Sequence, residues 1–176
     1  PQVSLAFKEK GLTLTRQDEV ITFVSRNLEP YRGFHTFMRA LPRILSNRPN
    51  AHVLILGGDD VSYGRRLPGG QTYRQNYMDE LKGENVDWKR VHFLGRIPYN
   101  QFLAVLQVSS VHVYLTYPFV LSWSMLNALA CECTVLASDT PPVREFIKHG
   151  VNGLLNDFFD VQGFAEQALV ILEKPS

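Results

Sequence analysis

The sequence from Val111 to Ala137 reads VHVYLTYPFVLSWSMLNALACECTVLA and determines the fold that we predict for this chain. It begins and ends with short apolar runs that are typical of buried strands. Pro118 introduces a turn after the first run, and the residues from Ser124 to Ala130 form a short helix before the second. We therefore predict a strand, a turn, a helix and a second strand, with a ligand site where the turn meets the start of the helix.

A stretch of this length and hydrophobicity resembles a membrane-spanning helix, which needs about 20 consecutive apolar residues. Three residues argue against that interpretation. Pro118 would break a helix in the middle of the run, and the polar side chains of Asn127 and Glu132 are costly in lipid. The sequence therefore favours a buried core segment.

The composition predicts one globular domain without a strong overall charge. The chain has 176 residues, of which 45% are hydrophobic, and this is enough for one substantial core. Its 18 basic and 17 acidic residues give a formal charge of +1, so no global field attracts nucleic acid or an acidic membrane. Any anion site must therefore be local.

The two cysteines, Cys131 and Cys133, are one residue apart. On a strand their side chains would point to opposite faces, which disfavours a disulfide or a zinc site. We expect two buried thiols in a reducing compartment, and hence a cytoplasmic protein. The sequence starts at Pro1 rather than Met and shows no signal peptide, so we expect a piece of a longer protein.

Outside the central stretch, short apolar strands alternate with amphipathic helices. Residues 1–19 show no sustained period and are predicted to be a linker or entering segment. We predict strands at 20–24, 51–56, 91–94, 111–115, 134–137 and 154–155, and helices at 34–45, 73–81, 100–106 (capped by Asn100), 124–130, 141–147 and 162–172. This order predicts an α/β domain over residues 20–176, with a mainly parallel sheet and helices on both of its faces.

In such sheets, ligands bind at the carboxyl ends of the strands, beside helix N-termini. The loops that follow the predicted strands are 25–33, 57–60, 95–99 and 116–124. The first contains Arg26 and Arg32, followed by Gly33, which permits close backbone approach just before a helix. Two guanidinium groups at that position would bind a phosphate or pyrophosphate. The alternative is a pair of solvated surface arginines.

A second anion site is predicted at the helix start of the central stretch. The backbone N–H groups of Ser122, Trp123 and Ser124 would be free to point at an anion. Alternatively, a serine hydroxyl caps the helix in the ordinary way. Asn127 lies one turn into the helix, where its amide would bond sugar hydroxyls or simply face solvent.

We predict no metal site. Asp59 and Asp60 follow a Gly-Gly pair, and adjacent aspartates at such positions are usually turn formers. The five histidines are scattered, without an i, i+4 pair or a carboxylate at ligand spacing. The sequence shows neither a Ser-His-Asp arrangement nor a phosphate loop that ends in Gly-Lys-Ser/Thr.

An ordered series of motifs runs through the chain. The series comprises Val24-Ser-Arg26 with Glu29, Arg32 and Gly33, Leu54-Ile-Leu-Gly57, Val91-His-Phe-Leu-Gly95, Asn127-Ala-Leu-Ala130, Val135-Leu-Ala-Ser-Asp139, Glu145 and Gly150-Val-Asn-Gly153. In order and spacing it resembles the C-terminal domain of group 1 glycosyltransferases, which are retaining GT-B enzymes related to sucrose-phosphate synthases and bacterial mannosyltransferases. The resemblance covers residues 20–172 and rests on the whole series, because no single motif is diagnostic.

The resemblance implies a Rossmann-like three-layer sandwich, the C-terminal half of a GT-B enzyme, that binds a nucleotide-sugar donor. Arg26 and Arg32 match the family's catalytic basic pair on the donor diphosphate, with Arg32 in place of the usual lysine. The loop at Arg96 and Ile97 lies where the family holds the base. The donor-binding residues predicted in this way are Gly33, Arg96, Ile97, Phe119, Ser122, Trp123, Ser124 and Asn127.

The chain departs from the family pattern at three further positions. Phe119 and Asn127 stand where the family often has two glutamates, the first near the donor sugar and the second on the ribose hydroxyls. Glu132 stands where a glycine is usual. Asn127 is neutral and shorter than glutamate, although its amide can still bond a ribose.

The resemblance implies the donor-binding domain of a retaining hexosyltransferase that uses a nucleoside-diphosphate sugar. Because the sequence shows no metal constellation, we expect a metal-independent enzyme without a further cofactor. The acceptor would be bound mainly by an N-terminal domain absent from this chain, so this fragment alone would be inactive. Any peripheral membrane contact would be made through that domain, and we expect no nucleic-acid partner.

Two other functions remain open. One is a degenerate, non-catalytic Rossmann-like interaction module, because both glutamates and the glycine are lost. The other is a flavodoxin-like regulatory domain, which shares the fold pattern but would have an acidic pocket at the end of the first strand, where this chain has Arg26.

Overall fold

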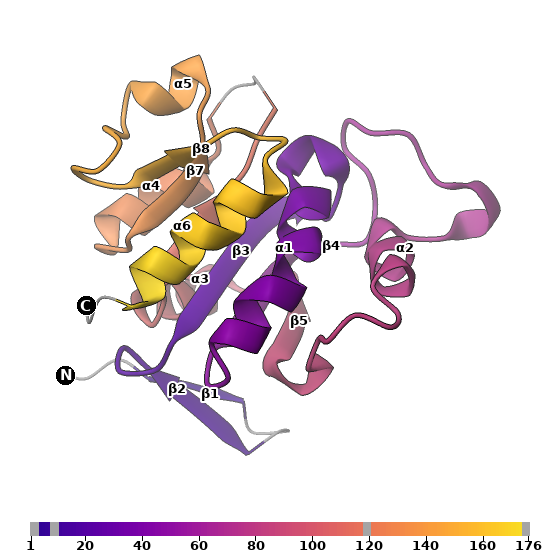
Figure 1. The fold of residues 1–176 in the computed structure, drawn as a ribbon, viewed down its shortest axis with the longest axis horizontal. Coiled ribbons are helices and arrows are strands. Elements are labelled where there is room, and N and C mark those ends of the chain that lie inside the picture. Colours follow the sequence, from indigo (N-terminus) through magenta and orange to yellow (C-terminus); the bar gives the residue numbers. More distant parts are fainter. Residues whose placement is uncertain (1–3, 8–10, 118–120, 174–176) are drawn as a thin grey trace.

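Six parallel strands form one sheet in the order β5–β4–β3–β6–β7–β8 (Figure 1). The computed structural model describes residues 4–7, 11–117 and 121–173. The strands of this sheet are β3 (Val20–Asn27), β4 (His52–Gly58), β5 (Val91–Gly95), β6 (Val111–Tyr114), β7 (Val135–Ser138) and β8 (Leu154–Asn156). Ile21 pairs with Val53 of β4 on one side and with Val111 of β6 on the other. The strand closest to the N-terminus is therefore central in the sheet.

Helices cover both faces of this sheet (Figure 1). The first face carries α1 (Phe34–Asn47), α2 (Tyr73–Glu80) and α6 (Val161–Glu173), and the second carries α3 (Tyr99–Gln107) and α4 (Trp123–Ala130). The remaining helices are α5 (Pro141–Arg144) and the 3₁₀ turns η2 (Pro30–Arg32), η3 (Pro68–Gly70) and η4 (Trp88–Arg90). The predicted α/β fold with a parallel sheet between two helical layers is thus confirmed.

The core follows the alternation of side chains along the strands. Ile21 and Phe23 of β3 face α1 and α6, and the ring of Phe23 stacks on that of Phe37 at a centroid distance of 4.8 Å. On the other face, Leu54 of β4 packs with Val105 near the end of α3. Because β3 and β4 are buried on both faces, their sequences are nearly continuous apolar runs.

A two-stranded antiparallel hairpin precedes the sheet. It consists of β1 (Ser4–Phe7) and β2 (Leu12–Thr15) and leads directly into β3 at the end of the sheet where the strands begin (Figure 1). The carboxylate of Asp18 closes the turn by accepting the Thr15 N–H at 2.7 Å. The sequence predicts no strand here, because two four-residue strands are too short to establish a period.

Three predicted boundaries are wrong. β3 continues to Asn27, which pairs with Gly58 after a register shift, so Arg26 lies on the strand and not on its exit loop. Asn100 does not cap α3, because that helix begins at Tyr99 with Pro98 at the cap position. The helix predicted for 141–147 ends at Arg144, as α5.

The strand order reverses between β3 and β6. The chain leaves β3 toward α1 on one face and leaves β6 toward α4 on the other, so the loops after these two strands diverge. In open parallel sheets the crevice at such a switch point, outside the carboxyl ends of the strands, is the usual ligand site. The fold therefore places the candidate site at the loops that follow β3, β4, β5 and β6.

None of the helices in the described ranges combines the length and hydropathy that a bilayer crossing requires. The central stretch, which could be mistaken for a span in the sequence, is divided into β6, α4 and β7 in the part that the structure describes.

Candidate functional site

The loops after β3 and β6 are joined where Gly33 meets Leu115. Gly33 has a φ of +70°, and a Cβ atom added to it would lie 2.1 Å from the Cβ of Leu115. The Tyr117 N–H donates to the Tyr31 carbonyl at 3.1 Å, next to this contact. The space beside Gly33 is thus occupied by the neighbouring loop of the chain itself.

The loop after β4 is held to the same place by a buried carboxylate. Glu29 is fully buried and accepts the backbone N–H groups of Ser62, Tyr63 and Gly64 at 3.0, 3.1 and 2.7 Å. Hydrogen bonds to an ionised acceptor are among the stronger ones in proteins. Glu29 therefore fixes the position of the β4–α2 loop relative to the end of β3.

Arg32 connects these three loops. Its Nη1 donates to the Thr116 hydroxyl, after β6, at 3.3 Å. Its guanidinium also lies over the ring of Tyr63 from the β4–α2 loop, 5.2 Å from the centroid. Arg32 is only partly exposed, so its positive charge is held in place beside Tyr63.

Arg26, Arg96 and Ile97 line one cavity of about 350 Å³ at the ends of β3, β4 and β5. Apart from these three, its walls are Val24, Ser25, Leu56, Gly57, Gly95 and Phe102. Most of these walls are apolar, and the two arginines provide the positive charge. An apolar slot with a cationic edge suits a flat aromatic group that is linked to an anion.

A second cavity, also of about 350 Å³, adjoins the first. Arg26 and Arg96 line both, and the second also includes Asp60, Ser62 and Tyr63. The Arg96 Nη2 donates to the Oδ1 of Asn27 at 3.1 Å, which keeps the guanidinium over the end of β3. Because Tyr63 contacts Arg32, this second cavity extends from Arg26 toward the loops of the switch point.

The start of α4 is capped by the protein itself. The Ser122 hydroxyl accepts the Ser124 N–H at 3.3 Å, and the Ser122 N–H donates to the phenol of Tyr114 at 2.8 Å. Burial raises the pKa of the Tyr114 phenol. The expectation that the N–H groups of Ser122 and Ser124 are free for an anion is therefore wrong, and the alternative, capping by a serine, is correct. Trp123 points outward and is 80% exposed.

Asn127 lies one turn into α4, and both ends of its amide are engaged. Its Nδ2 donates to the Trp123 carbonyl at 2.8 Å, and its Oδ1 accepts from the phenol of Tyr99 at 3.0 Å. Asn127 is partly buried, whereas Tyr99 is 63% exposed. Phe119, the other residue at a position of a family glutamate, lies outside the described residues.

The aspartates after β4 take part in ion pairs. Asp59 pairs with Arg74 at 2.6 Å and Asp60 with Arg66 at 2.7 Å. Within the described ranges, no three His, Cys, Asp or Glu side chains are close enough together to hold a metal ion.

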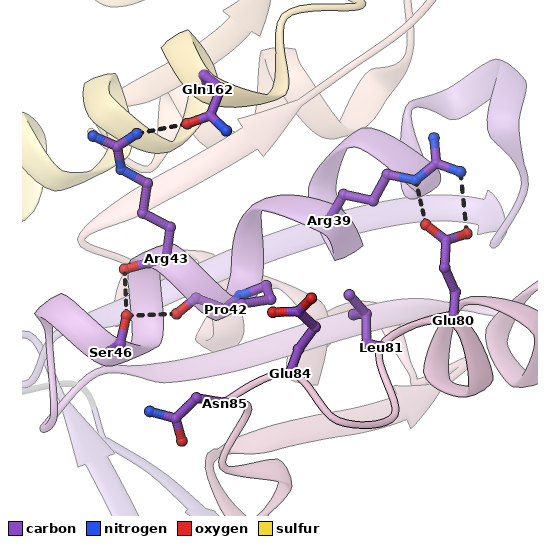
Figure 2. Close-up of a pocket in the computed structure, with 9 residues that line it drawn as sticks. All are labelled: Arg39, Pro42, Arg43, Ser46, Glu80, Leu81, Glu84, Asn85 and Gln162. Carbon is purple, nitrogen blue, oxygen red and sulfur yellow. Dashed lines mark hydrogen bonds and ion pairs between the residues drawn. The ribbon is translucent and has the colours of Figure 1, made fainter.

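Another groove, of about 590 Å³, lies between α1, α2 and the start of α6 (Figure 2). Its α1 residues run from Arg39 to Ser46, in the part of the helix that leads away from the strand ends. Arg39 forms two bonds to Glu80, at 2.6 and 3.1 Å, and Arg43 bonds Gln162 at 2.6 Å. Both arginines of this groove are in ion pairs, Arg39 with Glu80 and Arg43 with Glu166, and the loops of the switch point do not line it. We therefore do not assign the site to this groove.

Several residues at the site were not predicted from the sequence. Glu29 belongs to the matched motif series, but its contacts span more than 30 residues and leave no local signal. Phe102 lies in the helix predicted for 100–106 and Tyr99 at the end of the predicted loop 95–99, and neither was named as a site residue. That such residues lie close to the site is known only once the structure shows where α3 lies relative to β3 and α4.

Comparison with known proteins agrees with this geometry. Residues 7–176 match the family described as glycosyl transferases group 1. A phosphatidyl-myo-inositol mannosyltransferase from Mycolicibacterium smegmatis is 26% identical over 162 residues, which are 90% of this chain and 37% of the relative. The chain thus spans little more than a third of that relative's length.

Solved structures show the same fold. The C-terminal domain of LpcC, a group 1 family glycosyl transferase from Francisella tularensis, matches 89% of this chain and 76% of its own with a TM-score of 0.72 at 18% identity. Anabaena HepE, solved in complex with UDP-glucose, matches 89% of this chain and 39% of its own with a TM-score of 0.71 at 22% identity. The sequence match and the fold together show that this chain belongs to the group 1 glycosyl transferase family and forms the C-terminal, Rossmann-like domain of its GT-B fold.

Proposed function

We propose that this chain is the donor-binding domain of a retaining glycosyltransferase that uses a nucleoside-diphosphate sugar. The observation that carries the proposal is the apolar cavity edged by Arg26 and Arg96, which opens toward the switch point of the sheet. We place the base in the apolar part of this cavity. We place the diphosphate in the adjoining cavity, which is lined by Arg26 and by Tyr63, the residue that Arg32 contacts. HepE, which shares the fold, was solved with UDP-glucose.

The proposed chemistry is electrostatic. When the bond between the sugar and the diphosphate breaks, negative charge develops on the leaving phosphate oxygen. Arg26 and Arg32 stabilise that charge, and Arg32 is held ready for this by Thr116 and Tyr63. Since these guanidinium groups supply the positive charge, we propose a reaction that needs neither a metal ion nor a further cofactor. The acceptor is bound mainly by another domain, and the fragment alone is inactive.

The compartment belongs to the same proposal. Burial raises the pKa of the Cys133 thiol to about 12, and its Sγ donates to the Leu106 carbonyl at 3.0 Å. Both cysteines are free thiols, which fits a reducing compartment, and we place the protein in the cytoplasm.

Titration with UDP and with GDP by calorimetry tests the proposal. We expect binding to the wild-type protein, weakened about 10-fold to 100-fold in Arg26→Ala and in Arg32→Ala, because hydrogen bonds to charged groups are worth about 1.5–3 kcal/mol. Arg43→Ala is the matched control, since Arg43 is an exposed arginine of α1 that pairs with Glu166. No binding by the wild type at millimolar nucleotide, or unchanged binding in both site variants, would refute the proposal.

The self-capped start of α4 and the engaged amide of Asn127 favour a second candidate, a non-catalytic module derived from such an enzyme. Asn127→Glu separates the two. A large gain in nucleotide affinity would indicate a decayed site, because a carboxylate accepts hydrogen bonds from both hydroxyls of a ribose. Without a gain, wild-type binding at the arginines supports the enzyme.

A further inference from the structure

Three exposed aromatic side chains meet at the carboxyl ends of the strands, beside the start of α1. Tyr31 lies after β3, Tyr117 after β6 and Phe159 after β8. The ring of Tyr117 contacts those of Tyr31 and Phe159 edge to face, at centroid distances of 6.0 and 6.2 Å. Tyr31 is 47% exposed, Tyr117 44% and Phe159 68%. We call these three residues the aromatic ridge, and contiguous exposed apolar surface of this kind marks an interaction site.

The aromatic ridge is held in place by the backbone beneath it. The Tyr117 N–H donates to the Tyr31 carbonyl at 3.1 Å, which joins two of the three loops. Phe158, which precedes Phe159, is buried and contacts the ring of Tyr117 at a centroid distance of 5.8 Å. Its carbonyl accepts the hydroxyl of Thr36, on α1, at 3.0 Å. Because the three loops are already fixed, a ligand on the ridge loses little affinity to their ordering.

The aromatic ridge adjoins the arginine that we place at the diphosphate. Tyr31 and Tyr117 are the chain neighbours of Arg32 and Thr116, whose side chains bond each other at 3.3 Å. The cavity that we assign to the base lies at the ends of β3, β4 and β5, whereas β6 and β8 lie on the other side of β3 in the sheet. A group on the ridge is therefore beside the leaving phosphate and away from the base, where the transferred sugar meets its acceptor.

The chemistry of the aromatic ridge suits a neutral saccharide. One face of a pyranose ring consists of C–H groups, which pack against aromatic rings, and its rim carries hydroxyls. The phenols of Tyr31 and Tyr117 both donate and accept hydrogen bonds. Asp157 and Asp160, on the same loop as Phe159, are exposed, and each accepts one backbone N–H through its Oδ1. Their Oδ2 atoms can accept hydroxyl protons, and the same two carboxylates repel a phosphate or an anionic lipid surface.

We propose that the aromatic ridge binds a pyranose ring of the acceptor, so that this enzyme glycosylates a saccharide or a glycoside. The acceptor role rests on the proposed donor-binding function, whereas binding of a saccharide to the ridge can be measured without it. The sugar ring stacks on the exposed aromatic rings, and its hydroxyls bond the phenols and carboxylates at their edges. The other domain binds the rest of the acceptor.

Saturation-transfer NMR of the chain with methyl glucoside, methyl mannoside and methyl galactoside, without nucleotide, tests the site. We expect transfer to the ring protons of at least one of these glycosides. Phe159→Leu and Tyr117→Leu should each weaken that binding about 3-fold to 10-fold, the effect of one aromatic contact. Both variants keep an apolar side chain at an exposed position, so the fold is retained. Phe146→Leu is the matched control, because Phe146 is 41% exposed but follows α5, outside the ridge, and this variant should bind the glycoside as the wild type does.

The donor also contains a sugar, and calorimetry separates the two. Wild type and Phe159→Leu are titrated with UDP, UDP-glucose, GDP and GDP-mannose. We expect Phe159→Leu to bind all four as the wild type does, because the ridge holds the acceptor. If the variant loses affinity for a nucleotide sugar but not for its nucleotide, the ridge holds the donor sugar and the acceptor assignment is wrong.

The remaining outcomes decide between a saccharide and other occupants. Absence of transfer to all three glycosides, or equal binding by wild type and both ridge variants, would overturn the saccharide site. Cosedimentation with phosphatidylcholine and phosphatidylglycerol vesicles, or dimerisation in analytical ultracentrifugation, would overturn it as well if Phe159→Leu abolished either one. If the wild type binds a glycoside on the ridge but neither UDP nor GDP, the donor-binding function fails and the saccharide site stands without it.

Discussion

The Cβ of Leu115 occupies the space in which a side chain on Gly33 would begin, 2.1 Å from the ideal Cβ position. This contact joins the two loops of the switch point, and the left-handed backbone of Gly33, with φ +70°, adds a second reason for glycine. The geometry of the candidate site therefore depends on the absence of a single methyl group.

Gly33→Ala should destabilise the protein by about 2–5 kcal/mol, because overpacking adds to the cost of a positive φ. Denaturant unfolding measures the loss. Gly69→Ala is the control, since Gly69 has nearly the same φ, +67°, but nothing within 4 Å of an added Cβ. That variant should lose only about 1–2 kcal/mol. Equal losses in both variants would show that Leu115 adjusts without cost.

Glu132→Gly should stabilise the protein by about 1 kcal/mol. Glu132 has a φ of +60°, a conformation that costs about 1–2 kcal/mol for a residue with a side chain. Its contact with Arg16, at 4.0 Å between two exposed side chains, contributes little. Thermal unfolding of the variant should therefore show a higher Tm. Glu145→Gly, at a φ of −66°, should instead lower the Tm. A lower Tm in both variants would contradict the explanation that the positive φ of Glu132 is strained.

Glu29→Gln should loosen the β4–α2 loop. In this variant an NH2 group replaces one carboxylate oxygen and faces N–H donors, and the charge that strengthens three hydrogen bonds is lost. We therefore expect the free energy of unfolding to fall by about 1.5–3 kcal/mol. Hydrogen exchange should become faster at Ser62, Tyr63 and Gly64 in particular. Glu166→Gln, which breaks an exposed pair with Arg43, should change the stability by less than about 0.5 kcal/mol. If hydrogen exchange at these three amides were unchanged in Glu29→Gln, the carboxylate of Glu29 would not be what fixes the β4–α2 loop.

His112 should make the protein sensitive to acid. It is fully buried, and burial lowers the pKa of its imidazole from 6.5 to about 3. Below pH 6.5 the unfolded chain binds a proton at His112 that the folded chain excludes, so stability is complete above pH 6.5 and is lost as the pH falls toward 3. Each pH unit in this window should cost about 1.4 kcal/mol.

The variant His112→Asn tests this prediction through the pH dependence of the unfolding free energy, and not through its absolute value. Asparagine can keep the bond that the Nδ1 of His112 makes to the Thr22 hydroxyl at 3.0 Å. Between pH 6 and pH 5, the fall in unfolding free energy should be smaller in the variant than in the wild type by about 1.4 kcal/mol. Identical slopes would mean that the folded protein admits the proton at His112.

The fold could be predicted from the sequence to within a few residues at most element ends. Apolar runs such as Val20–Val24 and the helical spacing after Gly33 are local signals, and they identify strands and helices whose order implies a parallel sheet. The end of β3 was missed because Arg26 and Asn27 are polar, and the strand reaches them through the pairing of Asn27 with Gly58 of β4, a contact with no local signal. The hairpin before β3 was missed because each of its two strands has only four residues, too few to establish a period.

The candidate site was predicted in outline. Arg26, Arg96 and Ile97 were identified as loop residues at strand ends, and the structure brings them to one cavity. The free amides of Ser122 and Ser124 were predicted wrongly, because sequence cannot show that the phenol of Tyr114 and the Ser122 hydroxyl already accept those protons. The contact between Tyr99 and Asn127 joins residues 28 positions apart on two helices, and no periodicity encodes it.

The central position of β3 also has a consequence for biosynthesis. Translation produces β3 first among the strands of the large sheet, yet its partner β6 begins about 90 residues later, where Ile21 meets Val111. Until the ribosome has delivered β6, one edge of β3 has unpaired N–H and C=O groups beside the apolar side chains of Ile21 and Phe23, an arrangement that promotes aggregation. A nascent chain that ends before Val111 should therefore depend on a chaperone, whereas one that extends past Tyr114 can close its central strand.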